Sequence, residues 1–117
     1  MTPAAKSVYF FGFYLLGLAL ILIVVPNFLL SLFQMPSTNE VWIRVVGALA
    51  GGIGTYYVQM APTNNTQFLS ATIGVRLSIL VWFTLFVLAG WAPAALIIFG
   101  LADAVGAAWT FLSMKKS

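Results

Sequence analysis

Long apolar stretches dominate the chain, and little of it alternates between apolar and polar residues. Four such stretches lie at about residues 7–25, 41–60, 68–90 and 93–114. Each comes near the ~20 residues that a helix needs to cross a bilayer. The segments between them are short and polar or rich in turn residues, and they contain Pro36, Pro62 and Pro93. The pattern predicts an all-α, integral membrane four-helix bundle that forms a single domain over residues 1–117.

A proline follows the first apolar stretch and precedes a short segment with a polar face. After Pro26, the polar residues Asn27, Ser31 and Gln34 are spaced so that they fall on one side of a helix. We therefore expect a kink at Pro26 and a short helix that lies in the membrane interface. The alternative is that the first helix continues, tilted, as far as Phe33.

The charged residues predict how the chain is oriented in the membrane. They make up only 6% of the sequence, and the formal net charge is +3. Lys6 precedes the first stretch and Lys115 and Lys116 follow the last one, whereas the loop expected on the opposite side holds Glu40. By the positive-inside rule, the N- and C-termini are expected to face the cytoplasm. The positive charge thus reflects topology, and no nucleic-acid partner is expected.

The composition excludes a water-soluble fold and most familiar catalytic chemistry. Hydrophobic residues make up 62% of the chain, too many for a globular surface to be covered by polar groups. Cys and His are absent and only two carboxylates exist, so the usual metal ligands, nucleophiles and general bases are missing. We therefore predict no enzyme activity, no catalytic residues, no metal site and no cofactor.

Four charges remain away from the terminal lysines, and two of them lie deep in the predicted membrane core. Glu40 and Arg44 are four residues apart at the start of the second stretch, where they are expected to pair locally. Arg76 and Asp103 fall near mid-membrane on helices joined by a very short turn. Because a lone charge at that depth is costly, we predict an Arg76–Asp103 ion pair inside the bundle. Arg44, reaching down from above, is a second candidate partner for Asp103.

Two interpretations of this predicted pair stay open. A buried ion pair can fix the register of the helices, and it can also mark a polar site that binds an ion, a proton or a lipid head group. Thr72, Gly106 and Thr110 share helical faces with the two charges, so a small polar cavity is a reasonable expectation. The candidate intramembrane polar site comprises Arg44, Arg76, Asp103, Tyr56, Tyr57 and Thr110.

Small residues mark the faces on which helices are expected to pack. Gly47, Gly51 and Gly54 recur at helical spacing in the second stretch, and Gly106 lies on a small-residue face of the fourth. Such faces let backbones approach closely where lipid provides no hydrophobic driving force between helices. Packing within one chain explains them, and homo-oligomer formation through the same faces is the alternative.

The polar and small residues of the last three stretches form a longer pattern, R-x-x-G…G-x-Y-Y…R-L…D-x-x-G-A-x-W-T. Its members are Arg44, Gly47, Gly54, Tyr56, Tyr57, Arg76, Leu77, Asp103, Gly106, Ala107, Trp109 and Thr110. The pattern resembles that of small bacterial four-helix membrane proteins of the DoxX-like and related domain-of-unknown-function families. The resemblance implies a four-helix fold and a multi-pass location in the bacterial inner (plasma) membrane, and it brings no function with it.

Three classes of function are compatible with these features. The first is a small scaffold or accessory subunit that acts through a membrane-protein partner. The second is a binder or carrier of a lipid or another hydrophobic small molecule, which predicts a cavity bounded by Arg44, Arg76, Asp103 and the tyrosines. The third is a minimal dimeric transporter, which resembles the small multidrug exporters in size and span count. This class is the weakest, because the resemblance implies an acidic residue in the first helix and the first stretch contains none.

Overall fold

A computed structural model describes residues 1–116 of the chain, with side chains through residue 115, and the regular elements of this part are all helices. The elements are α1 (Pro3–Val24), α2 (Pro26–Leu32), α3 (Trp42–Met60), the short 3₁₀ helix η1 (Ala61–Thr63), α4 (Thr66–Leu88) and α5 (Leu96–Lys116). The all-α class is therefore confirmed. The four predicted stretches correspond to α1, α3, α4 and α5, and the predicted short helix after Pro26 is α2.

Local capping explains where two of the long helices begin. The Thr2 side chain accepts a hydrogen bond from the backbone N–H of Ala5 at 3.1 Å, and the proline after it is preorganised for the first helical position. The Asn65 side chain does the same for α4 by accepting from the N–H of Phe68 at 3.1 Å. Each cap supplies an acceptor for a donor that the first helical turn leaves free.

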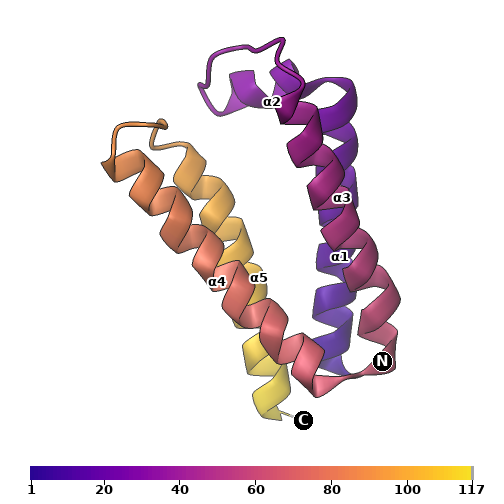
Figure 1. Cartoon of the computed structure of the whole chain (residues 1–117). Coiled ribbons are helices and arrows are strands. Elements are labelled where there is room, and N and C mark those ends of the chain that lie inside the picture. Colours follow the sequence, from indigo (N-terminus) through magenta and orange to yellow (C-terminus); the bar gives the residue numbers. More distant parts are fainter. Residues whose placement is uncertain (117) are drawn as a thin grey trace.

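The long helices form two hairpins arranged as a V (Figure 1). In the first hairpin α1 packs along α3, and in the second α4 packs along α5. The two hairpins meet chiefly through α1 and α5, at the end of the molecule where both termini lie (Figure 1). A four-helix bundle packed along its whole length is thus not confirmed, because the hairpins diverge toward α2.

Glycines bring α1 and α3 into backbone contact. A Cβ added at Gly54 would lie 2.8 Å from the carbonyl oxygen of Gly12, and one added at Gly47 would lie 2.9 Å from the Cβ of Leu22. Gly51 also faces α1, 3.2 Å from the Cβ of Ala19 by the same measure. The predicted glycine face therefore packs within the chain. Close packing of this kind is a main source of helix association in lipid.

The buried core lies at the closed end of the V. It joins α1 to η1, α3 and α4 through Ala4, Ala5, Val8, Phe11, Tyr57, Ala61 and Leu69. At the opposite end, the Phe33 ring after α2 stacks on Phe99 of α5, with ring centroids 3.9 Å apart. The segment that contains α2 therefore bridges the two hairpins where their long helices no longer touch.

Three helices, α1, α4 and α5, are long and apolar enough to cross a membrane. Large apolar side chains such as Leu88 and Trp91 are exposed over the surface, as expected for side chains that face lipid. Helix α3 is not among the three, because Arg44, Gln59 and its glycines lower its mean hydropathy. Length and composition thus indicate a membrane protein, and a fourth span through α3 stays a prediction.

Replacing Gly54 tests the close contact between α1 and α3. Gly54→Leu forces a side chain against the Gly12 carbonyl and is expected to lower the stability of the protein by roughly 1–3 kcal/mol, the usual cost of overpacking. Gly52→Leu is the matched control, since no atom lies within 4 Å of a Cβ at Gly52. Thermal unfolding in detergent, followed by Trp fluorescence, measures both variants. Equal melting temperatures would contradict the packing.

Candidate functional site

Side chains from one face each of α1, α4 and α5 converge between the hairpins. On α1 this face carries Ser7, Phe11 and Tyr14, at the spacing that places residues on one side of a helix. On α5 the corresponding face carries Asp103, Gly106 and Thr110, and on α4 it carries Thr72 and Arg76. These positions form two neighbouring features, a polar junction and a cavity.

The polar junction, which we define as Ser7, Thr72, Arg76 and Thr110, holds a fully buried guanidinium. Arg76 is only 2% exposed although it lies near the middle of α4. Its Nε donates to the backbone carbonyl of Thr72 at 3.1 Å, and its Nη2 donates to the hydroxyls of Thr72 at 3.0 Å and Thr110 at 2.8 Å. These bonds satisfy three of the five N–H groups of the side chain.

A continuous series of hydrogen bonds runs from Arg76 to the backbone of α1. The Thr110 hydroxyl accepts from Arg76, and its oxygen lies 2.5 Å from that of Ser7. The Ser7 hydroxyl donates to the carbonyl of Ala4 at 2.7 Å, so its own lone pairs are free to accept from Thr110. In this arrangement Thr110 donates to Ser7, the nearer of its two acceptors, because the Gly106 carbonyl lies 3.2 Å away. The junction thus ties together α4, α5 and α1.

The remaining nitrogen of the guanidinium, Nη1 of Arg76, is buried without a hydrogen-bond partner. Two aromatic rings lie beside the group instead, with the Arg76 Cζ 5.0 Å from the centroid of Phe11 and 5.9 Å from that of Tyr57. A desolvated cation over aromatic faces gains about 2 kcal/mol. Gly106 gives this nitrogen room, because a Cβ there would lie 3.2 Å from Nη1 and 2.8 Å from the Phe11 ring.

The predicted Arg76–Asp103 ion pair is wrong as a direct contact. Among the residues whose side chains are described, no carboxylate oxygen lies within 4.0 Å of the Arg76 guanidinium, and its free nitrogen has no acceptor. The two groups still interact electrostatically across the gap. The reason is that Thr72 and Thr110 already hold the guanidinium, while Asp103, about two turns before Thr110 on α5, faces a cavity.

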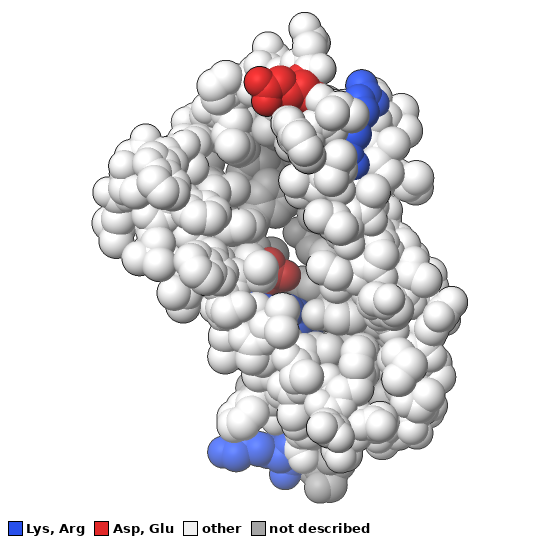
Figure 2. Space-filling view, in the orientation of Figure 1, with Lys and Arg blue, Asp and Glu red and all other residues white. Residues whose placement is uncertain are grey.

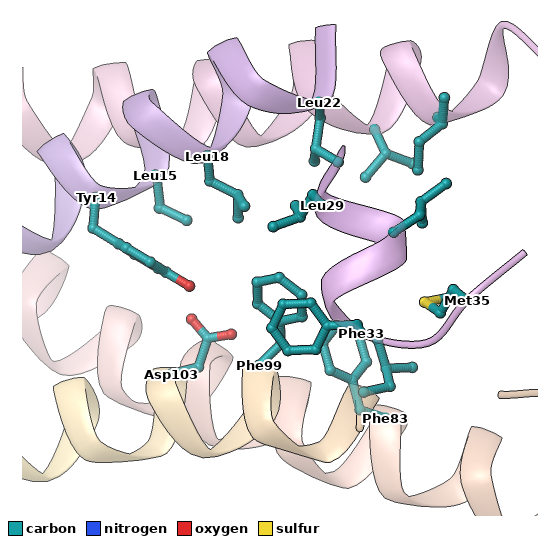
Figure 3. Close-up of a pocket in the computed structure, with 14 residues that line it drawn as sticks. Tyr14, Leu15, Leu18, Leu22, Leu29, Phe33, Met35, Phe83, Phe99 and Asp103 are labelled. Atoms are coloured by element: carbon teal, nitrogen blue, oxygen red, sulfur yellow. The ribbon is translucent and has the colours of Figure 1, made fainter. Parts of the chain in front are cut away.

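This cavity, which we call the hairpin cavity, has a volume of about 200 Å³ and lies between the diverging helices (Figure 3). All five α-helices or their ends contribute apolar side chains to its wall, among them Leu18, Leu22, Leu29, Phe33, Phe83 and Phe99. Tyr14 and Asp103 are its two polar residues. Figure 3 shows the Tyr14 hydroxyl and the Asp103 carboxylate pointing toward each other at one end.

The hairpin cavity adjoins an open groove on the surface of the molecule. The groove runs between α1 and α5 and shares five lining residues with the cavity: Tyr14, Leu18, Leu29, Phe33 and Phe99. Gly17 also lines the groove, and the space beside it is open, because no atom lies within 4 Å of a Cβ added at this position. Figure 2 shows a hollow between the two arms of the molecule, with acidic atoms visible inside it.

The other predicted site residues are dispersed. Arg44 is exposed at the far end, where its Nη1 donates to the carbonyl of Ile23 in the last turn of α1. This bond satisfies a carbonyl that the helix end leaves free, and it replaces both the expected pairing with Glu40 and the expected reach to Asp103. Tyr57 lies beside the junction, with its ring centroid 5.9 Å from the Arg76 Cζ, whereas Tyr56 is 67% exposed.

Sequence reasoning missed the contribution of α1. Ser7, Phe11 and Tyr14 were not among the predicted site residues, although each is needed to complete the junction or the cavity. The available signal was their common helical face, which continues through Leu18 and Leu22. That signal is weak, because a stretch this apolar shows little contrast between one face and another.

No protein-family model matches the chain, and neither does any curated protein or solved structure. The resemblance to DoxX-like proteins therefore stays a prediction. Within residues 1–116, no group of three acidic, His or Cys side chains is placed to hold a metal ion. The arrangement itself thus carries the functional argument: an apolar cavity with one carboxylate and one hydroxyl at its end.

Replacing Thr110 tests the polar junction. Thr110→Val keeps the shape of the side chain but removes the oxygen that accepts from Arg76, and leaving a buried donor without a partner costs roughly 1–3 kcal/mol. Thr110→Ser, which retains the hydroxyl, is the control and should unfold near the wild-type temperature. If the valine and serine variants unfold at the same temperature in detergent, the junction does not hold the hairpins together.

Proposed function

We propose that this protein is a multi-pass membrane protein that binds an apolar, lipid-like molecule in the hairpin cavity. The observation that carries the proposal is the cavity itself, with apolar walls and a polar end formed by Tyr14 and Asp103. Binding sites for small molecules typically combine an apolar lining with a few polar groups that fix the orientation of the ligand. A scaffold acting only through its outer faces needs no such cavity.

The dimensions suit an alkyl chain or a ring rather than a large solute. Apolar cavities of about 150 Å³ bind molecules of the size of benzene, and the hairpin cavity has about 200 Å³. A longer molecule would continue into the adjoining groove, which lies between the candidate spans α1 and α5. Because that groove is open at the surface between two candidate spans, the ligand would reach the cavity from the bilayer.

The orientation that we propose places both termini in the cytoplasm of a bacterial cell, with all four long helices crossing the inner membrane. Lys6 and Lys115 are exposed at the end where the termini lie, and Glu40 lies on the loop before α3 at the other end. This distribution supports the orientation by the positive-inside rule.

Narrowing the groove should block access to the hairpin cavity. Gly17→Phe places a ring in open space at the groove and leaves the packing of α1 intact. A dodecane analogue that carries a photoreactive diazirine, added to the protein in lipid nanodiscs, is expected to label cavity residues such as Leu22 and Phe83. Excess dodecane should suppress that labelling in wild type, and Gly17→Phe should reduce it several-fold.

Gly74→Phe provides the matched control, because Gly74 lies in open space on α4 away from the cavity. It should leave cavity labelling at the wild-type level. Contact of the probe with bulk lipid does not saturate, whereas binding in a cavity does. If excess dodecane suppresses labelling at no cavity residue in wild type, the proposal is contradicted.

A cysteine-labelling experiment tests whether α3 crosses the membrane. Ser37→Cys lies before α3 and Thr63→Cys lies after it, and both positions are exposed. The proposed topology predicts that a membrane-impermeant maleimide, added to intact cells, labels Ser37→Cys but not Thr63→Cys. Permeabilised cells, in which both should react, supply the control. Equal labelling of the two cysteines in intact cells would show that α3 does not cross.

A further inference from the structure

The polar end of the hairpin cavity offers an acceptor and a hydroxyl that the protein leaves without partners. The Asp103 carboxylate and the Tyr14 hydroxyl both line the cavity, and no side chain or backbone group in the described part of the chain forms a hydrogen bond with either. Figure 3 shows that the two groups face each other from α1 and α5. A ligand head group placed here would therefore meet both.

The carboxylate limits the head group to one that donates hydrogen bonds. An ionised Asp accepts but cannot donate, and it repels another anion. The Arg76 guanidinium could attract an anion, but it does not line the cavity, and three of its N–H groups point to Thr72 and Thr110. An anionic head group would therefore meet Asp103 before it met Arg76, which disfavours fatty-acid carboxylates and phosphates.

Tyr14 and the balance of charge then favour a hydroxyl head group over an ammonium head group. The Tyr14 hydroxyl can donate as well as accept, and only a head group that itself accepts can use that donor, which a hydroxyl does and an ammonium does not. The charges of Arg76 and Asp103 already cancel. An ammonium would add an unbalanced charge in a region of low dielectric, where such charges are costly.

We propose that the hairpin cavity binds a neutral long-chain alcohol. The ligand hydroxyl donates to the Asp103 carboxylate and accepts from the Tyr14 hydroxyl, and the hydrocarbon chain occupies the apolar cavity and the groove between α1 and α5. This inference rests on the proposed binding of an apolar molecule and adds the chemical class of its head group. It also gives a function to Asp103, whose carboxylate forms no ion pair with Arg76.

Competition between molecules of matched chain length tests the inference. The photoreactive dodecane probe is bound to wild-type protein in lipid nanodiscs, and dodecanol, dodecylamine, dodecanesulfonate or dodecane is added at equal amounts per lipid at neutral pH. Dodecanol is expected to suppress cavity labelling at a concentration about tenfold lower than any of the other three, as a charge-assisted hydrogen bond implies.

Two variants assign the effect to the two groups. Asp103→Asn keeps the shape but removes the charge, and it should abolish most of the advantage of dodecanol, whereas Glu40→Gln, at the other acid of the chain, should not. Tyr14→Phe removes one neutral hydrogen bond and should weaken dodecanol about threefold to tenfold. Tyr56→Phe is its control, because Tyr56 is exposed and does not line the hairpin cavity.

The outcomes separate this inference from the proposed function. If the dodecane probe labels the cavity saturably but dodecanol competes no better than dodecane, the head-group assignment is wrong and the apolar site stands. If dodecylamine or dodecanesulfonate competes best, the site recognises a charged head group and the inference is again overturned. If the probe shows no saturable labelling, the proposed function itself fails.

Discussion

The burial of a single guanidinium constrains the rest of this structure. Arg76 lies at the centre of a candidate membrane span and is almost completely buried, so its charge must be accommodated by protein groups rather than by water. The backbone and hydroxyl of Thr72, the hydroxyl of Thr110 and two aromatic rings do this together. Between helices in lipid, hydrogen bonds and close contacts take over much of the role that the hydrophobic effect has in water. The junction is therefore the place where the two hairpins are held together.

The shape of the molecule follows from where that junction lies. Ser7 and Thr110 join α1 to α5 near the terminal end of the V, and Phe11 packs against Gly106 one turn farther along. Beyond this point the hairpins diverge, and the hairpin cavity occupies the space until the stack of Phe33 on Phe99 closes it. Asp103 lies at the boundary, where it interacts electrostatically with Arg76 and lines the cavity. The charge that stabilises the fold and the group that we propose to bind a ligand are thus coupled.

Much of the fold could be predicted from the sequence because its strongest signals are local. Four long apolar stretches give four long helices, and a proline followed by a polar face gives α2. The glycines of α3 were expected to mark a packing face, either within the chain or between copies of it, and in the structure they face α1. Four spans were predicted, and three helices are long and apolar enough to cross a membrane, because the polar and small residues of α3 weaken its apolar character.

The site could be predicted only in part, because the partners of each charge depend on how the hairpins meet. Arg76 and Thr110 belong to the predicted site, and Thr72 was expected only to share the helical face of Arg76. In the structure Arg76 donates to both threonine hydroxyls. Opposite charge alone suggested that Arg76 would pair with Asp103 and Arg44 with Glu40. In the structure, threonine hydroxyls accept from Arg76 and the free carbonyl of Ile23 accepts from Arg44, because these acceptors lie within reach of the guanidinium groups. The role of Tyr14 depends on the angle between the hairpins, and no feature of an apolar stretch reports that angle.

The most direct test of this account is the reactivity of Asp103 toward two carbodiimides, measured by peptide mass spectrometry in lipid nanodiscs. Dicyclohexylcarbodiimide reaches carboxyl groups from the lipid phase, whereas a water-soluble carbodiimide reaches those exposed to water. The account predicts that the lipid-soluble reagent modifies Asp103, that dodecanol slows this reaction, and that the water-soluble reagent modifies Glu40 but not Asp103. Modification of Asp103 by the water-soluble reagent, or its failure to react with the lipid-soluble one, would contradict a carboxylate that faces an apolar cavity open to the bilayer.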